Sequence, residues 1–342
     1  MRVSELDYEL PDDLIAQTPA EPRDASRLMV VDVRHGTIAN HTFRDLPGFL
    51  LPGDALVLNE TKVFPARLEA KKPTGGEVEL LFLRDLGPDR GGAWEVLARP
   101  SKRLRPYLVL SAGGEQLRLL KSLGDGHWVV SGSDLPGLLR RSGRMPLPPY
   151  IRPTPEAEER YQTVYARNEG SAAAPTAGFH FTERVLEGAE RAGARIARIT
   201  LHVGVGTFMP VRTERLEEHT MHAEYYSVPR EAEQIVVGAR RVVAAGTTVA
   251  RTLETWATTG EAEGKSELFV YPGYRWQAVD TLLTNFHLPR STLLAMVMSF
   301  GGEELVREAY RTAVKERYRF YSFGDAMLLL DGGRQRWARL SL

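Results

Sequence analysis

The sequence predicts an α/β main domain with a mostly parallel or mixed sheet, into which a small antiparallel β-barrel is inserted. The start and the second half of the chain alternate helix-like and strand-like segments, which is the pattern of an α/β sheet. Residues 68–144 instead contain short β-rich runs separated by Gly, Pro and Asp turns about every 8 to 12 residues, a spacing typical of a small barrel or sandwich. The proline-rich run GRMPLPPYIRPTP then favours an extended linker back to the main domain.

The length of 342 residues also favours about two domains. We expect residues 1–62 and 150–330 to form the main domain and residues 63–149 to form the inserted barrel. The last segment, residues 331–342, contains three arginines and is expected to be a basic C-terminal tail.

The elements of the main domain are expected from apolar periodicity and from cap and turn residues. Before the barrel, we expect a short helix at 11–16, a strand at 27–33, an antiparallel return strand at 37–41 and a buried strand at 55–58. After the barrel, helices are expected at 156–166, 183–192, 230–245, from Ser291 onward and at 303–316, with Thr182 and Ser291 as N-caps. Strands are expected at 194–203, 247–253, 266–271 and 282–285.

Composition excludes several classes of function. Lysine plus arginine and aspartate plus glutamate each number 44, so any argument for nucleic acid must depend on local patches. The absence of cysteine excludes disulfides, thiolate metal sites, iron–sulfur clusters and cysteine nucleophiles. No apolar run approaches the roughly 20 residues that span a bilayer, and the acidic N-terminus lacks a signal-peptide core. We therefore expect a soluble, cytoplasmic protein, without a membrane partner and monomeric.

The stretch GSAAAPTAGFHFT, residues 170–182, has the composition of a pocket wall. Its small residues allow a ligand to approach the backbone, and the helix that follows would direct its first N–H groups toward the loop. The alternative is a tight turn before an ordinary helix. Similar loops recur later, and polar residues follow strand after strand: Asn59 and Lys62, His202 with Gly204 and Gly206, Arg251 and Glu254, and Asn285 with His287. In an α/β fold such strand ends share one edge, where ligands bind.

The glycine loop GVGTFM does not match a dinucleotide fingerprint, because Met209 occupies the place of the third glycine. A phosphate-binding GxxxxGK[ST] motif is also absent from the sequence, so nicotinamide and ATP are not supported. The stretch EHTMHAEYY, with His219, His222 and Glu224, resembles half of a metal site, but it lacks HExxH order and a third ligand, so no metal is expected. The histidines could instead transfer protons or have structural, hydrogen-bonded roles.

Two basic runs belong to the β module. Arg99, Lys102, Arg103 and Arg105 form the first, and Arg140, Arg141, Arg144 and Arg152 form the second. Either run could be a solvated loop, but two runs beside one β module are compatible with a docking surface for a polyanion.

Eight ordered motifs together resemble the S-adenosylmethionine:tRNA ribosyltransferase-isomerase family of queuosine biosynthesis. They are LPDDLIAQTPAEPRDASRL, GDALVLNETKVFPARL, GRMPLPPYI, YQTVYARNEGSAAAPTAGFHFT, LHVGVGTFMPVR, HTMHAEYY, TLLTNFHLPRSTLL and YRFYSFGDAMLL. The resemblance spans almost the whole chain except the variable β module and the tail. It implies the same architecture, a larger α/β domain with an inserted β-barrel.

The resemblance implies that the ribosyl part of S-adenosylmethionine is transferred to the aminomethyl group of a 7-deazaguanine at the tRNA wobble position. Adenine and methionine leave, and epoxyqueuosine remains. The proton beside a sulfonium is acidified by the positive charge, so a histidine is a sufficient base. S-adenosylmethionine is then a co-substrate, and no cofactor is expected.

Roles for individual residues follow from this chemistry. The expected catalytic residues are His180 or His222 as the base and Glu224, which together with Glu254 is expected near the sulfonium or ribose. Residues expected to bind S-adenosylmethionine are Thr176, Ala177, Gly178, Phe181, His202, Gly204, Gly206, Thr207, Arg251, Glu254, Asn285 and His287. Residues expected to bind tRNA are Asn59, Lys62, Arg67, Arg103, Arg105, Arg140, Arg141 and Arg144. Two alternatives remain: a metal-dependent hydrolase built on His219, His222 and Glu224, and a non-catalytic RNA-binding module that uses the arginine runs.

Overall fold

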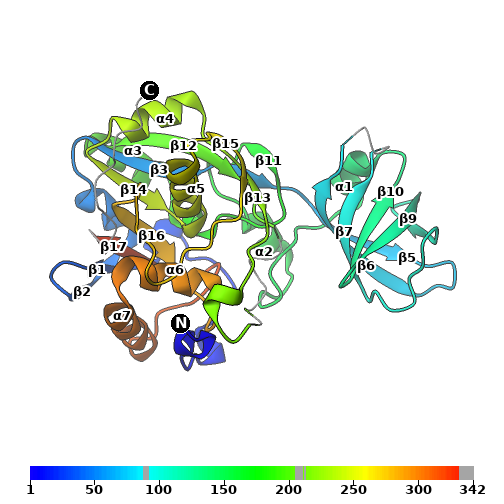
Figure 1. The fold of residues 1–342 in the computed structure, drawn as a ribbon, viewed down its shortest axis with the longest axis horizontal. Coiled ribbons are helices and arrows are strands. Elements are labelled where there is room, and N and C mark those ends of the chain that lie inside the picture. The colour runs from blue at the N-terminus through cyan, green and yellow to red at the C-terminus, as the bar shows by residue number, and fades with distance from the viewer. Residues whose placement is uncertain (88–91, 205–210, 212, 331–342) are drawn as a thin grey trace.

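The computed structural model describes residues 1–87, 92–204, 211 and 213–330. Figure 1 shows two lobes, an α/β main domain and a smaller β-barrel, which are joined by extended segments. The predicted fold class, an α/β domain with an inserted antiparallel barrel, is confirmed. The predicted boundaries of the two domains stay a prediction, and the basic tail lies outside the described residues.

A mixed sheet forms the centre of the main domain. Among the described residues it has nine strands, in the spatial order β15 (Glu263–Ser266), β13 (Glu224–Ser227), β12 (Arg195–Leu201), β3 (Asp54–Asn59), β14 (Arg241–Ala245), β16 (Thr281–Asn285), β17 (Ala326–Leu330), β1 (Arg27–Asp32) and β2 (Thr37–Thr42). The neighbours β12, β3, β14 and β16 run parallel, so their carboxyl ends meet at one edge. The return strand β2 pairs antiparallel with β1, as predicted.

Both faces of this sheet are covered. On β3, Ala55 and Val57 pack into one apolar cluster, and Leu56 and Leu58 pack into the opposite one. This alternation explains why the strand is apolar at consecutive positions. The first face is covered by α4 (Arg230–Val237), α5 (Thr247–Thr259), α6 (Thr292–Gly301) and α7 (Glu303–Lys315), and the second by α3 (Glu183–Arg191) (Figure 1).

Side-chain caps begin the helices where the sequence predicts them. Thr182 accepts a hydrogen bond from the Val185 amide at 3.4 Å, and Ser291 accepts one from the Leu294 amide at 3.2 Å. A shorter helix, α2 (Pro155–Arg160), begins after Thr154 and ends six residues earlier than expected from the sequence. Short 3-10 turns complete the main domain: η1 (Val3–Leu6), η2 (Asp12–Leu14), η3 (Arg23–Ala25), η4 (Phe43–Phe49), η6 (Thr176–His180) and η8 (Leu216–Glu218).

Three of the predicted elements are wrong. Residues 230–245 are not one helix, because α4 ends at Val237 and the apolar run 241–245 becomes β14 in the middle of the sheet. Residues 247–253 begin helix α5 rather than a strand, although their threonines favour strands locally. Burial of Leu253 and Trp256 on one helix face outweighs that preference. The strand predicted at 266–271 is instead β15, which ends at Ser266.

The barrel is closed and antiparallel. Its strands follow the order β10 (His127–Ser131), β7 (Trp94–Arg99), β6 (Glu77–Asp85), β5 (Arg67–Lys71), β8 (Val109–Ala112) and β9 (Glu115–Gly124). Inward side chains such as Leu80, Phe82 and Leu117 are fully buried, and α1 (Leu135–Ser142) packs on the same core. A two-stranded ribbon of β4 (Thr61–Val63) and β11 (Asn168–Ser171) lies in the segments that connect the lobes.

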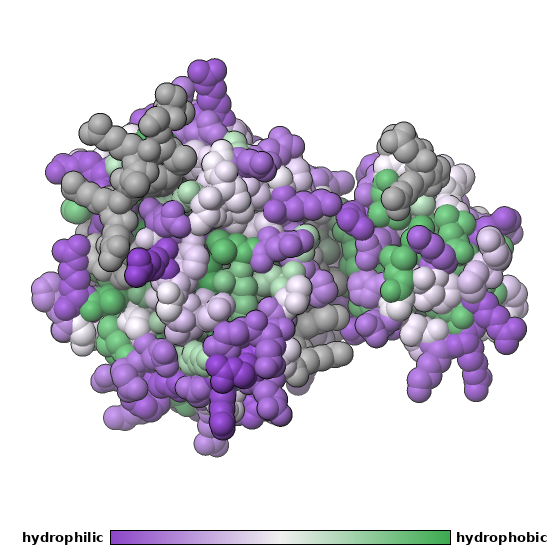
Figure 2. Space-filling model, viewed as in Figure 1, coloured by the Kyte–Doolittle hydropathy of each residue, from purple (hydrophilic) through white to green (hydrophobic). Residues whose placement is uncertain are grey.

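Hydrophilic residues gather around the periphery of both lobes, apolar residues are visible toward the middle of each, and the molecule narrows between the lobes (Figure 2). None of the described helices has both the length and the apolar composition required to cross a bilayer.

Candidate functional site

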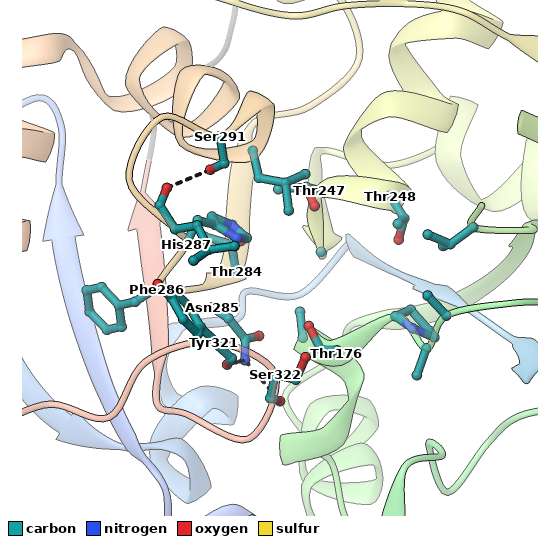
Figure 3. Close-up of a pocket in the computed structure, with 18 of the residues that line it drawn as sticks. Thr176, Thr247, Thr248, Thr284, Asn285, Phe286, His287, Ser291, Tyr321 and Ser322 are labelled. Carbon is teal, nitrogen blue, oxygen red and sulfur yellow. Dashed lines mark hydrogen bonds between the residues drawn. The ribbon is translucent and has the colours of Figure 1, made fainter. Parts of the chain in front are cut away.

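One pocket lies at the carboxyl edge of the parallel strands; we call it the strand-end pocket (Figure 3). It is lined by residues 173–177, 246–248 and 284–288, with Tyr150, Val203, Ser291, Leu293, Tyr321 and Ser322. The predicted meeting of strand ends at one edge is therefore confirmed for β14 and β16, and the glycine-rich stretch supplies the small-residue wall.

The N-terminus of α5 forms another part of this wall. Gly246 precedes the helix with φ of 111°, a conformation that favours glycine, and no side chain caps the first turn. Thr247 and Thr248 follow it along the pocket. The first N–H groups of a helix have no partners within the helix, so this end suits an electron-rich ligand group.

Asn285 offers a hydrogen-bond acceptor on the facing side. Its side-chain nitrogen donates to the Tyr321 carbonyl at 2.9 Å, and its Oδ1 is buried, with the side chain of Asn285 interacting with His180. Thr176 lies across the pocket from Asn285 (Figure 3). An amide oxygen has two lone pairs, so a ligand N–H could add a hydrogen bond to this acceptor.

His287 also lines the strand-end pocket, in its neutral form. Its Nε2 lies 2.7 Å from the Thr284 hydroxyl, and burial lowers the pKa of His287 to about 3. At neutral pH the ring is uncharged, so it contributes shape and a hydrogen bond rather than positive charge.

A second hollow, which we call the interlobe cleft, lies between the barrel and the main domain. It is lined by Phe64, Leu83, Arg84, Asp85, Trp94, Glu95 and His127 on one side and by Glu169, Gly170, His202, Val203, Gly204, His222, Ala223, Glu224 and Tyr225 on the other. Val203 lines both this cleft and the strand-end pocket. The two hollows are therefore adjacent.

A buried ion pair lies at this junction. Glu224, at the start of β13, accepts a hydrogen bond from the Gly204 amide at 2.7 Å, and its second oxygen pairs with the Arg251 guanidinium from α5. Both side chains are more than nine-tenths buried. Burial lowers the pKa of Arg251 to about 10, which still leaves it protonated at neutral pH. The structure thus holds a fixed carboxylate where the two hollows meet.

His202 forms part of the cleft wall. Its Nδ1 lies 2.8 Å from the Thr61 hydroxyl, and its ring stacks on Tyr225 with centroids 5.5 Å apart. A Cβ at Gly170 would lie 2.7 Å from His202 Nε2, so only glycine leaves room for this ring. Burial lowers the pKa of His202.

The two candidate bases differ in access. His222 is exposed and lines the interlobe cleft. His180 is buried, stacks on Phe43, hydrogen-bonds to Ser26 at 2.7 Å and lines none of the described pockets. Burial lowers the pKa of His180 to about 3, and nearby Arg319 acts in the same direction while Asn285 opposes it. The geometry therefore favours His222 as the base.

Four residues proposed for substrate contact have structural roles instead. Asn59 is fully buried and ties β3 to β12 through both the amide and the carbonyl of Leu201 at 3.1 Å, so it cannot lie at a tRNA entrance. Gly178 and Phe181 pack inside the domain, and Gly178 leaves room for the Tyr165 hydroxyl.

Glu254 is the fourth. Its carboxylate accepts hydrogen bonds from the amides of Gln277, Ala278 and Val279 at 2.9–3.0 Å and from the Tyr274 hydroxyl at 3.0 Å. It is fully buried and lines none of the described pockets. It therefore anchors the 274–279 segment to α5 rather than facing a sulfonium.

Of the remaining S-adenosylmethionine candidates, Arg251 lines neither hollow and pairs with Glu224, and the other described ones divide between the two hollows. Thr176, Ala177, Asn285 and His287 line the strand-end pocket, and His202 and Gly204 line the cleft. Gly206 and Thr207 lie outside the described residues.

The cations proposed to bind tRNA differ in their partners. Lys62 lies 3.9 Å from Glu169, and Arg67 bonds to Glu79 at 3.1 Å. Arg141 pairs with Glu115, and Arg144 pairs with Glu158 at 2.9 Å. By contrast, Arg103, Arg105 and Arg140 are exposed and make no ion pair within the described part of the chain.

The half metal site does not gain a third ligand. Across the described residues, no three His, Asp or Glu side chains converge in a metal-binding group. His219 packs against Phe269 with centroids 5.3 Å apart, and the Glu224 carboxylate is engaged by Gly204 and Arg251. The arrangement does not favour a metal-dependent hydrolase.

Sequence reasoning did not identify several lining residues. Thr247 and Thr248 were assigned to the strand predicted at 247–253 and not to a pocket, although Gly246 before them is compatible with the start of a helix. Tyr225 has no comparable sequence signal, because the sequence EYYS does not distinguish the exposed Tyr225 from the buried Tyr226, and only the folded strand alternates between buried and exposed positions. Phe64 and Trp94 are brought to the cleft only by the placement of the barrel.

Together these features define a two-lobed α/β enzyme with two adjoining hollows, one at the carboxyl edge of the sheet and one beside the barrel. The chain belongs to the queuosine biosynthesis protein family, whose model matches residues 3–329. The family resemblance predicted from the eight motifs is thereby confirmed.

Named relatives extend over almost the full chain. A protein from Rubrobacter xylanophilus named S-adenosylmethionine:tRNA ribosyltransferase-isomerase is 72% identical over 335 residues, 98% of this chain and 99% of that protein. One of the same name from Thermotoga maritima is 49% identical over 339 residues, 96% and 100% of the two chains. A crystal structure of S-adenosylmethionine tRNA ribosyltransferase from Thermotoga maritima matches with a TM-score of 0.55 at 38% identity, covering 96% of this chain and 100% of that one.

Proposed function

We propose that this protein is an S-adenosylmethionine:tRNA ribosyltransferase-isomerase. It transfers and isomerises the ribosyl moiety of S-adenosylmethionine onto 7-aminomethyl-7-deazaguanine at the tRNA wobble position, and it releases adenine and methionine. The observation that carries this proposal is the junction at Val203, where two hollows of different character meet beside the buried Glu224 carboxylate. Two large substrates can react only where their binding sites adjoin, because the reacting groups must come into contact.

S-adenosylmethionine occupies the strand-end pocket in this proposal. The alanine-rich wall lets a nucleoside lie close to the backbone, Asn285 Oδ1 accepts a ligand N–H, and the α5 N-terminus stabilises an electron-rich group. The sulfonium and ribose then point toward Val203 and Glu224. The carboxylate faces the cation and stabilises charge as the ribosyl group departs.

His222 is the base that removes the proton beside the sulfonium. It is exposed at the cleft, two residues before Glu224. We expect His222→Gln to lower the turnover number by about a hundredfold, the usual contribution of a general base, with little change in the KM for either substrate. The matched variant His180→Asn, which alters a buried ring outside both hollows, should retain most of the turnover. Equal losses in the two variants would contradict this assignment.

The first test is product analysis. Purified protein is incubated with S-adenosylmethionine and tRNA that carries the aminomethyl deazaguanine, and mass spectrometry follows free adenine and the mass of the wobble nucleoside. We expect both adenine and a heavier nucleoside. If neither product forms while the protein still binds tRNA, the RNA-binding alternative is favoured. If a chelator abolishes the activity, the metal-dependent hydrolase is favoured.

The tRNA backbone docks on the unpaired barrel arginines. Replacing Arg103, Arg105 and Arg140 with alanine should weaken tRNA binding and reduce the salt slope of log K by about 1 for each phosphate that is no longer neutralised, without changing S-adenosylmethionine binding. The paired Arg144 provides the control, since Arg144→Ala should change the slope less. The measurement is tRNA affinity between low and physiological salt. An unchanged slope in the triple variant would place the docking surface elsewhere.

Further features of the proposal follow from this chemistry. The sulfonium activates its own neighbouring proton, so no cofactor is required beyond the co-substrate. Both hollows are built within one chain, so a monomer would be sufficient for the reaction. A cytoplasmic location is part of the same proposal, because the substrate is tRNA. Light scattering of the purified protein tests the monomer directly, and metal analysis with a chelator control tests the cofactor requirement.

A further inference from the structure

The interlobe cleft has aromatic rings on both walls. On the main-domain wall, Tyr225 is 39% exposed and stacks on His202, with an interplanar angle of 24°. On the barrel wall, Trp94 meets Phe64 edge-to-face with centroids 5.6 Å apart. An exposed tyrosine supported from behind by a stacked ring is a platform on which a flat molecule can lie.

The described lining of the cleft is acidic on balance. Asp85, Glu95, Glu169 and Glu224 line it, and three of them have cationic partners: Glu95 bonds to Arg84 at 2.9 Å, Glu169 lies 3.9 Å from Lys62, and Glu224 pairs with Arg251. Because the described carboxylates outnumber these cations, the surface suits a base that carries an aminomethyl cation better than it suits phosphates. The unpaired barrel arginines offer the complementary surface for phosphates.

The cleft also leads to the place of reaction. Val203 lines the cleft and the strand-end pocket alike, and Gly204 holds the Glu224 carboxylate beside it. A base held in the cleft would therefore present its substituent to the ribosyl donor. Single-stranded RNA is commonly recognised by stacking splayed bases on aromatic side chains, because bases paired or stacked within the loop are not accessible.

We infer that Tyr225, backed by His202, is the stacking platform for the splayed wobble base of the tRNA, and that the cleft binds this base rather than the backbone. Tyr225 is thus a positioning residue for the acceptor, and S-adenosylmethionine is bound without it. This inference rests on the proposed function for the identity of the base. It assigns to the cleft a recognition role that is separate from the arginine surface.

The test measures how tightly two RNAs bind to the unaltered full-length protein and to two of its variants. The RNAs are an anticodon stem-loop with 7-aminomethyl-7-deazaguanine at the wobble position and the same stem-loop abasic at that position. The variants are Tyr225→Ala, which removes the ring, and Tyr225→Phe, which keeps the ring but loses the hydroxyl that donates to Glu263 at 2.8 Å. Equilibrium affinities are measured for each combination, together with the KM for S-adenosylmethionine.

The unaltered protein should bind the base-containing RNA about tenfold more tightly than the abasic RNA. In Tyr225→Ala this difference should fall to within about twofold, whereas Tyr225→Phe should retain it. The KM for S-adenosylmethionine and the salt slope should stay unchanged, which a general loss of structure would not allow.

Equal weakening of both RNAs by Tyr225→Ala, or no weakening of either, would overturn the inference. The proposed function is judged separately, by whether the unaltered protein forms adenine and the heavier nucleoside.

Discussion

Replacing Glu224 with glutamine should lower the turnover number by about a hundredfold or more, the usual cost of removing one preorganised electrostatic contact to a transition state. The amide keeps the shape of the side chain and can still accept the hydrogen bond from Gly204, but it loses the negative charge beside Val203. The cationic sulfonium then reacts without a facing carboxylate. KM values should change less than the turnover number, since both hollows keep their walls.

The same substitution should also destabilise the fold. It leaves the buried Arg251 guanidinium without its anionic partner, and breaking a buried pair costs about 3–5 kcal/mol. Urea unfolding measures this loss, and steady-state kinetics below the unfolding range measures the turnover. Glu187→Gln is the matched control, because Glu187 is an exposed carboxylate on α3 that pairs with Arg191 at 3.4 Å and lines neither hollow. A Glu224→Gln protein with full turnover would remove Glu224 from the mechanism.

Stability should fall steeply as the pH decreases from about 6.5 to 5, before most carboxylates titrate. Burial lowers the pKa of His180 and of His287 to about 3 in the folded protein, whereas an unfolded histidine titrates near 6.5. Below pH 6.5 the unfolded chain therefore binds more protons than the folded one, and protonation favours unfolding. Above pH 6.5 both states are neutral at these positions, and the stabilisation is complete.

The expected size follows from linkage. Each such histidine contributes a slope of about 1.4 kcal/mol per pH unit, so the two together cost about 4 kcal/mol between pH 6.5 and 5. Burial raises the pKa of Glu254, which acts in the opposite direction and reduces the net slope. The measurement is the free energy of unfolding in urea at pH 7.5, 6 and 5.

In the variant His180→Asn, only His287 of these two histidines remains, so their contribution to the pH dependence of the free energy of unfolding should fall by about half. A free energy of unfolding that stays constant from pH 7.5 to 5 would contradict the buried, neutral state of both rings.

Local sequence signals were sufficient where a short segment determines its own structure. The cap residues Thr182 and Ser291 begin their helices as predicted, because a cap needs only an oxygen one turn before a free amide. The turn spacing of residues 68–144 predicted a barrel, and the strand-like run at 27–33 predicted β1. The composition of residues 170–182 also predicted a pocket wall, because small residues let a ligand approach the backbone closely.

Local signals gave wrong predictions where tertiary contacts determine the secondary structure or the role of a side chain. The threonines at the start of α5 favour a strand in isolation, and burial of Leu253 and Trp256 makes them helical. Glu254 appeared to be a ligand to a cation, yet three backbone amides occupy its carboxylate. Polar residues at a strand end look alike in sequence, whether they face a pocket or satisfy the backbone.

By itself, the sequence determined the class of fold, the family and the edge of the sheet at which the strand-end pocket lies, because these depend on periodicity, turns and ordered motifs that are local in the chain. Only the tertiary structure decided which histidine is accessible, that Glu224 is fixed by Arg251 from another element, and that Tyr225 and Trp94 line opposite walls of one cleft. The burial of a side chain and its ionic partners depend on residues far apart in sequence. They therefore determine its protonation state and its accessibility only once the chain has folded.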